Sequence, residues 1–241
     1  MRFHVLIPAR YASTRFPGKP LADLAGKPMV VRVCERAAKS GATAVHVATD
    51  DERIASAVRA HGHQAIMTRA DHACGTDRLA EAAKKLKLRD NEIVVNVQGD
   101  EPLISPRLIR AVGALLARRP GASVSTACHA IHDPASASNP NVVKVVLDSD
   151  GYALYFSRSQ IPHPRAPGAP SYRHAGIYGY RVAFLKKYSR LKASPLEKAE
   201  VLEQLRVLWH GYRIAVAVSE TEIAPGVDTP QELEAVRRMI Q

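Results

Sequence analysis

Apolar and polar positions along the first half of the chain alternate between two periods. Short runs of β-branched and other apolar residues occupy positions 3–7, 44–48, 64–67 and 92–97. A longer stretch follows each run, with apolar side chains recurring every three or four residues, and these stretches end near residues 39, 61, 86 and 117. Strands that alternate with helices in this way predict βαβ units and a largely parallel sheet with helices on both faces.

The second half of the chain breaks this alternation. After a strand near residues 123–128, the runs 142–147 and 153–157 are joined by Asp148-Ser149-Asp150-Gly151, which predicts a hairpin and therefore a mixed sheet. The other expected elements are strands at 173–181 and 214–218, a helix from Pro195 through Trp209 and a last helix after Pro230. We predict a single α/β domain over residues 1–241, with a mixed, mostly parallel, Rossmann-like sheet flanked by helices.

Two of the late helices carry capping boxes at their starts. Ser194 pairs with Glu197, and Thr229 pairs with Glu232, each three residues later. Since Thr229 takes the cap, Asp228 is left without a capping role. Within the first of these helices, an apolar stripe predicts a core or dimer contact through Leu202, Leu205, Leu208 and Trp209.

Composition limits the class of partner. With 46% hydrophobic and 24% charged residues, and no apolar run of membrane-spanning length, the chain is typical of a globular protein. The net charge of +11 invites a nucleic-acid interpretation. However, aromatic residues are few and no run of five lysines occurs, so an anionic small substrate is the simpler partner. Three scattered cysteines outside any zinc or C-x-x-C pattern predict reduced thiols in a cytoplasm.

A cationic loop follows the first strand. Residues 7 to 20 present Arg10, Arg15 and Lys19, together with the hydroxyls of Ser13 and Thr14. Guanidinium groups, an ammonium and backbone N–H groups are what a triphosphate needs, and open α/β sheets bind ligands at the carboxyl ends of their strands. A solvated basic loop is the alternative. Pro20 after Gly18-Lys19 excludes a P-loop, and no G-x-G-x-x-G occurs.

Two further segments carry candidate chemistry. Asp100 follows the apolar run 92–97, at the end of the strand where ligands bind. Because a carboxylate beside a polyanionic substrate needs a cation between them, Asp100 predicts a bound Mg²⁺. Capping of the next turn is the alternative. Gly75-Thr76-Asp77 opens a helix, where N–H groups and a hydroxyl suit an anion, and ordinary capping explains it equally well.

The run Pro8-Ala9-Arg10, then Ser13-Thr14-Arg15 and Pro17-Gly18-Lys19, resembles the nucleotide-binding loop of the cytidylyltransferases that activate acidic sugars. It looks most like the 3-deoxy-manno-octulosonate (Kdo) cytidylyltransferase family, the CMP-Kdo synthetases of lipopolysaccharide synthesis. The resemblance covers nearly the whole chain and is strongest at residues 7–20, 96–102, 139–158, 173–181 and 202–229. It implies the nucleotide-diphospho-sugar transferase type of fold.

The resemblance also implies roles for individual residues. The nucleotide is bound by Ala9, Arg10, Ser13, Thr14, Arg15, Lys19, Gly75 and Thr76. The sugar is bound by Gln98, Arg158, His174, Tyr178, Glu203 and Gln204. Mg²⁺ is held by Asp100 and Asp228, and the catalytic set is Arg10, Lys19, Asp100 and Asp228. Cys74 stands where the family usually has serine.

The implied reaction is transfer of CMP from CTP to the anomeric hydroxyl of Kdo, with release of pyrophosphate. The resemblance implies CTP and Kdo as substrates with Mg²⁺. The cysteines favour a cytoplasmic location, the apolar stripe favours a homodimer, and the composition predicts neither nucleic-acid binding nor membrane insertion. Three alternatives stay open: transfer to a related acid such as 8-amino-Kdo or a sialic acid, a nucleotide-binding module without turnover, and a nucleic-acid binder.

Overall fold

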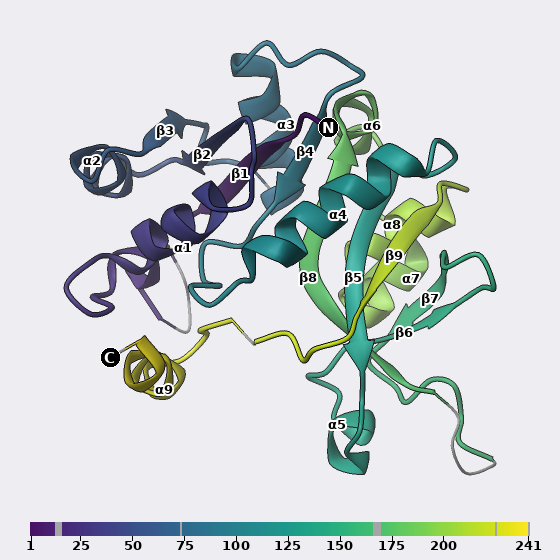
Figure 1. Ribbon diagram of the computed structural model, residues 1–241. Coiled ribbons are helices and arrows are strands. Elements are labelled where there is room, and N and C mark those ends of the chain that lie inside the picture. Colours follow the sequence, from purple (N-terminus) through teal and green to yellow (C-terminus); the bar gives the residue numbers. More distant parts are fainter. Residues whose placement is uncertain (13–15, 73, 166–169, 225, 241) are drawn as a thin grey trace.

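The computed structural model of the chain describes residues 1–12, 16–72, 74–165, 170–224 and 226–240. Within this described part the strands form one sheet with the order β3-β2-β1-β4-β8-β5-β9 (Figure 1). The strands are β1 (His4–Ala9), β2 (Ala44–Thr49), β3 (Gln64–Met67), β4 (Ile93–Asn96), β5 (Val124–Ala130), β6 (Lys144–Leu147), β7 (Ala153–Ser157), β8 (Tyr172–Arg181) and β9 (Ile214–Ser219). Strand β8 runs antiparallel to both β4 and β5, while the other strands of this order run parallel to one another.

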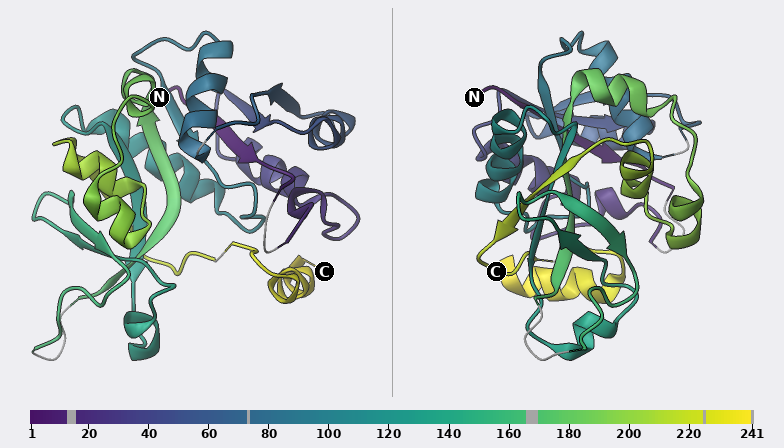
Figure 2. Two further views of the ribbon diagram at one scale, coloured as in Figure 1. Left: turned by 180° about the vertical axis from the view of Figure 1, so that it is seen from behind. Right: turned by 90° about the vertical axis from the view of Figure 1, so that its right-hand side faces the viewer.

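Helices cover both faces of the sheet. They are α1 (Met29–Ala38), α2 (Glu52–Ala60), α3 (Gly75–Lys85), α4 (Pro106–Arg118), α5 (Pro134–Ser138), α6 (Val182–Tyr188), α7 (Pro195–Glu200), α8 (Gln204–Trp209) and α9 (Pro230–Ile240), with a 3₁₀ turn, η1, at Lys19–Leu21. Helices α1, α2 and α4 pack into one apolar cluster, and α3, α6 and α8 pack into another. The view from behind in Figure 2 brings the light-green α7 and α8 in front of the sheet.

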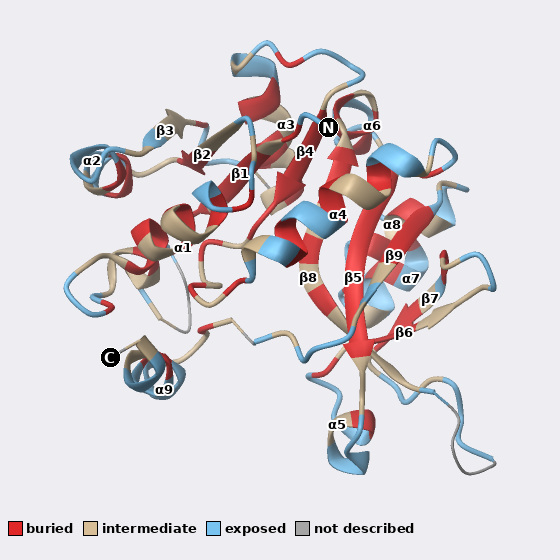
Figure 3. Cartoon of the chain, in the orientation of Figure 1, coloured by how far each residue is buried: buried red, intermediate tan, exposed pale blue. Residues whose placement is uncertain are grey.

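The central strands are buried on both sides, as the apolar runs predict. In β1, Val5 and Ile7 belong to the first cluster, while Leu6 between them belongs to the second. Alternate side chains of a strand point to opposite faces, so a strand that lacks polar positions must lie between two packed layers. Figure 3 shows this as an almost continuous band of buried residues through the middle of the sheet.

The observed fold confirms the mixed, mostly parallel sheet and its flanking helices. The predicted hairpin forms as β6 and β7, and Gly151 in its turn adopts a φ of 78°.

One prediction is wrong: a single helix does not run from Pro195 through Trp209. The chain leaves the helix after Glu200, Val201 adopts a left-handed conformation with a φ of 54°, and α8 starts at Gln204. Helix α5, capped by Asp133, is not anticipated by the sequence patterns above.

A buried cation ties the hairpin to neighbouring loops. Lys144, at the start of β6, is 0% exposed, and burial lowers its pKa. Its ammonium donates to the carbonyl oxygens of Asn139 (2.9 Å), Val142 (2.6 Å) and Arg158 (2.5 Å). All three of its donors are therefore used, and the loop before β6 is joined to the end of β7.

We expect Lys144→Met to destabilise the protein by about 2–4 kcal/mol, because one buried and two partly buried carbonyl groups lose their partner. Urea unfolding followed by circular dichroism measures this change. Lys84→Met on the exposed side of α3 is the matched control and should change stability by less than ~0.5 kcal/mol. Equal effects of the two substitutions would contradict the structural role of Lys144.

Candidate functional site

A cavity of about 720 Å³ opens at the carboxyl ends of β1 and β4. Ligands of open α/β sheets bind at this edge, and pockets for small molecules commonly measure roughly 300–1,000 Å³. The start of α3, one face of β8 and the segment between α7 and α8 form the other walls. The cavity therefore draws on segments from nearly the whole length of the chain.

Most of the sequence-predicted site residues meet in this cavity. Its lining includes Ala9, Arg10, Lys19, Gly75, Thr76, Gln98, Asp100, Tyr178, Glu203, Gln204 and Asp228. Arg158 and His174 are not among the described residues that line it. Ser13, Thr14 and Arg15 lie outside the described residues.

The described part of the cationic loop is shaped by a turn at Gly18. This residue has a φ of 72°, a value that favours glycine, and its N–H donates to the carbonyl oxygen of Tyr11 at 3.0 Å. The guanidinium of Arg53 on α2 lies 3.4 Å from the centre of the Tyr11 ring. These contacts fix the start of η1, so that Lys19 reaches the cavity.

Lys19 joins the two predicted metal carboxylates. Its ammonium lies 2.5 Å from Oδ2 of Asp100 and 3.1 Å from Oδ1 of Asp228. The Lys19 side chain is 12% exposed, whereas those of Asp100 and Asp228 are 31% and 44% exposed. Asp228 stands just before the capping box of α9, where Glu232 donates its backbone N–H to Thr229 Oγ1 at 3.2 Å. Two carboxylates from distant segments thus converge on one cation.

This donor set fits Mg²⁺. Magnesium prefers oxygen ligands and is commonly bound by one or two carboxylates together with substrate phosphates and water. The convergence of Asp100 and Asp228 on the Lys19 ammonium shows that both carboxylates reach one cationic position. No group of three His, Cys, Asp or Glu side chains able to hold a metal occurs within the described ranges. An ion at this position would therefore need phosphate oxygens as well.

Glu101 adds little negative charge to this edge. Its Oε2 atom is buried and finds no hydrogen-bond partner among the residues that the structure describes. Burial, and to a lesser extent the neighbouring charge of Asp100, raises the pKa of Glu101 to about 8. At neutral pH its carboxyl group is mostly protonated, which limits repulsion of an anionic ligand.

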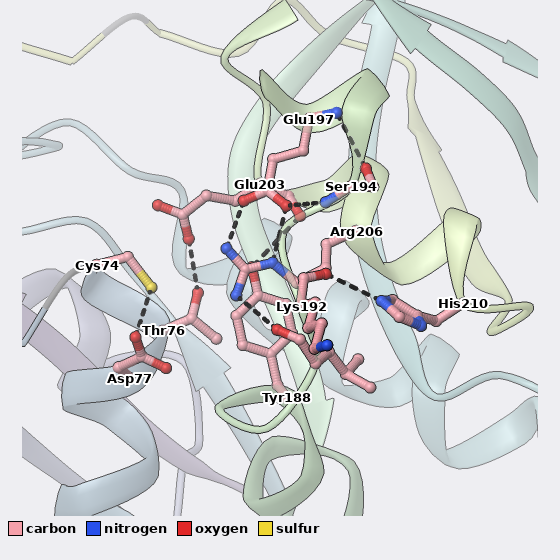
Figure 4. A network of polar contacts seen from close by, with 11 residues as sticks. Cys74, Thr76, Asp77, Tyr188, Lys192, Ser194, Glu197, Glu203, Arg206 and His210 are labelled. Carbon is pink, nitrogen blue, oxygen red and sulfur yellow. Dashed lines mark hydrogen bonds and ion pairs between the residues drawn. The ribbon is translucent and has the colours of Figure 1, made fainter. Parts of the chain in front are cut away.

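The start of α3 is linked directly to the far wall of the cavity. Thr76 Oγ1 donates to Glu203 Oε2 at 3.2 Å, which connects α3 to the residue before α8 (Figure 4). Cys74 is the N-cap of α3 but makes no capping hydrogen bond, and its Sγ lies 3.4 Å from Asp77 Oδ2. Ordinary capping by Thr76 or Asp77 is therefore not what these side chains do.

Strand β8 presents aromatic side chains toward the cavity. Tyr178 and Tyr180 line it, and their rings are stacked with centroids 5.9 Å apart. His174 lies behind them, with its Nε2 3.0 Å from Thr126 Oγ1 and its ring edge-on to Phe156. Burial lowers the pKa of His174 to about 3, so its imidazole is neutral at physiological pH.

Arg158 follows β7 and is held by backbone carbonyl groups. Its Nε donates to the carbonyl oxygen of Glu200 at 2.7 Å, and Nη1 donates to that of Pro140 at 3.1 Å. The Glu200 carboxylate in turn accepts the Arg158 backbone N–H at 2.9 Å. The guanidinium is therefore fixed against the loop before β6.

Sequence reasoning missed Asn96, Tyr180 and Tyr188, which also line the cavity. Tyr180 could have been predicted from the sequence, because it lies two residues beyond Tyr178 in a strand and its side chain therefore shares the same face. Tyr188 comes from α6 and enters through tertiary packing alone, which no local pattern reveals.

No helix in the described part of the chain combines the length and the apolar character needed to cross a membrane.

Comparison with known proteins adds to this geometry. A family model described as Cytidylyltransferase matches residues 4–214. The chain is 58% identical to the 3-deoxy-manno-octulosonate cytidylyltransferase of Verminephrobacter eiseniae (strain EF01-2), covering 99% of this chain and 94% of that protein. It is 57% identical to the protein of the same name from Acidovorax sp. (strain JS42), covering 99% and 97%.

Solved structures show the same relationship. A CMP:2-keto-3-deoxy-manno-octonic acid synthetase complexed with CTP superposes with a TM-score of 0.94 at 48% identity, covering 99% of this chain and 98% of that one. A cytidylyltransferase from Leptospira borgpetersenii serovar Hardjo-bovis (strain JB197) gives a TM-score of 0.68 at 19% identity, covering 100% and 87%, and shares the fold. On these grounds the chain belongs to the cytidylyltransferase family and, within it, to the 3-deoxy-manno-octulosonate cytidylyltransferases.

Proposed function

We propose that this protein transfers CMP from CTP to the anomeric hydroxyl of Kdo, releasing pyrophosphate and forming CMP-Kdo for lipopolysaccharide synthesis. The observation that carries the proposal is one cavity in which a cationic loop, two converging carboxylates and a polar, tyrosine-lined wall face each other. The relatives of 57–58% identity that are named for this reaction support the choice of substrates.

The strand-built half of the cavity is proposed to bind the nucleotide. Arg10 and Lys19 neutralise the triphosphate, with Ser13, Thr14 and Arg15 of the same loop as further predicted ligands. Ala9, Gly75 and Thr76 contact the rest of the nucleotide. Lys19 is already paired with Asp100 and Asp228. The triphosphate therefore shares the Lys19 ammonium with these two carboxylates and does not meet an unpaired cation.

Asp100 and Asp228 are proposed to hold Mg²⁺. The ion, when bound, supplies positive charge that offsets the α-phosphate and favours attack by the sugar hydroxyl. Both carboxylates would hold the ion beside Lys19, since both contact the Lys19 ammonium. Mostly protonated Glu101 avoids adding a third full negative charge there.

The wall formed by β8 and α8 is proposed to bind the sugar. Gln98, Tyr178, Glu203 and Gln204 contact its hydroxyl groups, and Arg158 and His174 complete the predicted set. The resemblance predicts Arg158 as the ligand of the sugar carboxylate, but its Nε and Nη1 donate to backbone carbonyl groups and it is not among the described residues that line the cavity.

The reaction consists of one displacement at phosphorus. A bond forms between the anomeric oxygen and the α-phosphorus, the bond to the oxygen shared with the β-phosphate breaks, and the hydroxyl proton is released. Pyrophosphate carries away the displaced oxygen. Catalysis of this kind depends mainly on positioning and on stabilisation of the phosphate charges.

We further propose that residues 1–241 act as one cytidylyltransferase domain in a cytoplasmic homodimer. The three cysteines are free, in keeping with a reducing compartment. Of the apolar stripe, Leu202 and Leu205 are buried within the core, whereas Trp209 is 54% exposed and is the member available to a second copy.

Pyrophosphate release with CTP and Mg²⁺ tests the proposed function. We expect release with Kdo, none with a sialic acid, and loss of release when EDTA removes the metal. Pyrophosphate release with 8-amino-Kdo or a sialic acid, and not with Kdo, would show that the enzyme is specific for another acid sugar. A protein that binds CTP but stays silent with all three sugars would instead be a binding module.

We expect Asp100→Asn and Asp228→Asn each to lower kcat by about 100-fold or more, with a much smaller change in the Kd for CTP, because they weaken charge stabilisation at the reacting phosphate. Steady-state kinetics and calorimetric titration with CTP measure the two quantities. Asp150→Asn, in the exposed hairpin turn, is the matched control and should leave both unchanged. An Asp100→Asn enzyme with full kcat would contradict the proposed metal role.

The imidazole of His174 should stay neutral from pH 8 to pH 5. Its pKa is lowered to about 3, whereas an unperturbed histidine has a pKa of about 6.5 and is mostly protonated at pH 5. Because the unfolded chain takes up this proton more readily, His174 reduces stability as the pH falls from about 6.5 toward 3. Nitrogen-15 chemical shifts, assigned with His174→Gln, check the prediction, which a titration midpoint near 6.5 would overturn.

A further inference from the structure

We infer that Arg206 is a positioning residue for the acid sugar, because it anchors the α7–α8 wall that presents Glu203 and Gln204 to the cavity. Arg206 is not among the described residues that line the cavity, so it acts through others. The inference rests on the proposed function, since its readout is the use of Kdo.

The α7–α8 wall cannot hold its own shape. Each of the two helices has only six residues, and isolated helices shorter than roughly 12 residues are marginal in water. Val201 between them adopts φ 54° and ψ 49°, a left-handed conformation that β-branched residues rarely occupy. The wall therefore depends on side-chain contacts beyond the backbone hydrogen bonds within each helix.

Arg206 supplies several of these contacts at once. Its Nε donates to Glu197 Oε2 at 2.8 Å, and its Nη2 donates to Glu197 Oε1, which makes a two-pronged ion pair between α8 and α7. The two side chains are 14% and 10% exposed, so this pair is largely shielded from water. Nη1 approaches the carbonyl oxygen of Leu191 at 3.5 Å, and the guanidinium lies 4.7 Å from the centre of the Tyr188 ring.

The anchor reaches the cavity through Tyr188. The Tyr188 hydroxyl donates to the backbone carbonyl oxygen of Glu203 at 3.3 Å, and the Glu203 carboxylate accepts a hydrogen bond from the Thr76 hydroxyl. Figure 4 shows this succession from Arg206 and Glu197, through Tyr188, to Glu203 and Thr76. Tyr188, Glu203 and Gln204 all line the cavity, so a shift of the anchor moves the proposed sugar ligands.

The shape of the guanidinium matters as much as its charge. A planar fork can meet both oxygens of Glu197 while its face lies on the Tyr188 ring, whereas the ammonium of lysine is a point charge. Glu197 is also the N3 residue of the α7 capping box and accepts the Ser194 N–H at 3.2 Å, a contact that glutamine can keep. Arg206→Lys and Glu197→Gln therefore weaken the anchor while leaving charge or capping in place.

The test compares Arg206→Lys with Arg213→Lys. Arg213 is a matched control, because it also stacks on a tyrosine, 3.5 Å from the centre of the Tyr152 ring, and pairs with an acidic residue, but it does not line the cavity. We expect Arg206→Lys to raise the KM for Kdo by about tenfold, the scale of one lost charged hydrogen bond, with smaller changes in kcat and in the Kd for CTP. Arg213→Lys should leave all three at wild-type values.

A merely structural role gives a different pattern. It lowers the thermal midpoint and the fraction of active enzyme, and hence kcat, while the KM for Kdo stays at its wild-type value; that result overturns the inference. Should Arg206→Lys fail to fold, Glu197→Gln and Tyr188→Phe must each raise the KM for Kdo selectively, and an unchanged KM in both overturns it equally. Wild-type enzyme that is silent with Kdo in the same assay rejects the proposed function itself, and this inference with it.

Discussion

The structure depends on the balance of charge at the edge where β1 and β4 end. A chain with a net charge of +11 brings Lys19 and two aspartates together at this edge, and the ammonium bridges both carboxylates. Each partner comes from a different part of the chain: a loop after the first strand, the turn after β4 and the segment before α9. The fold must therefore be complete before the site exists, which links the packing of α9 and Val227 against α1 directly to the chemistry.

Much of this was accessible from the sequence because the signals are local. Continuous apolar runs identified the central strands, and a turn rich in aspartate and glycine identified the β6–β7 hairpin. Asp228 could be singled out because Thr229 and Glu232 already satisfied the helix start. Arg10, Lys19 and Asp100 belong to segments that follow strand ends, where parallel sheets gather ligands, and all three line the cavity.

The remaining features depend on tertiary contacts. The helix expected through residue 209 breaks at Val201, since a largely shielded ion pair and a hydrogen bond from Tyr188 hold α8 in a separate position, against the continuous helical pattern. The resemblance predicts Arg158 and His174 as sugar ligands, yet the structure holds the first against backbone carbonyl groups and packs the second behind Tyr178. Such placements follow from neighbours that are distant in sequence.

The two halves of the cavity differ in how they can change over evolution. The nucleotide half stands on strands that are buried on both faces, so a substitution there disturbs the core as well as the ligand contacts. The proposed sugar half includes two six-residue helices, which are joined by residues 201–203 with an exposed Val201 and are anchored by a few side chains. Selection for a different acid sugar can therefore remodel the α7–α8 wall and leave nucleotide recognition intact, a division that allows one ancestral scaffold to diversify its acceptor without losing its donor.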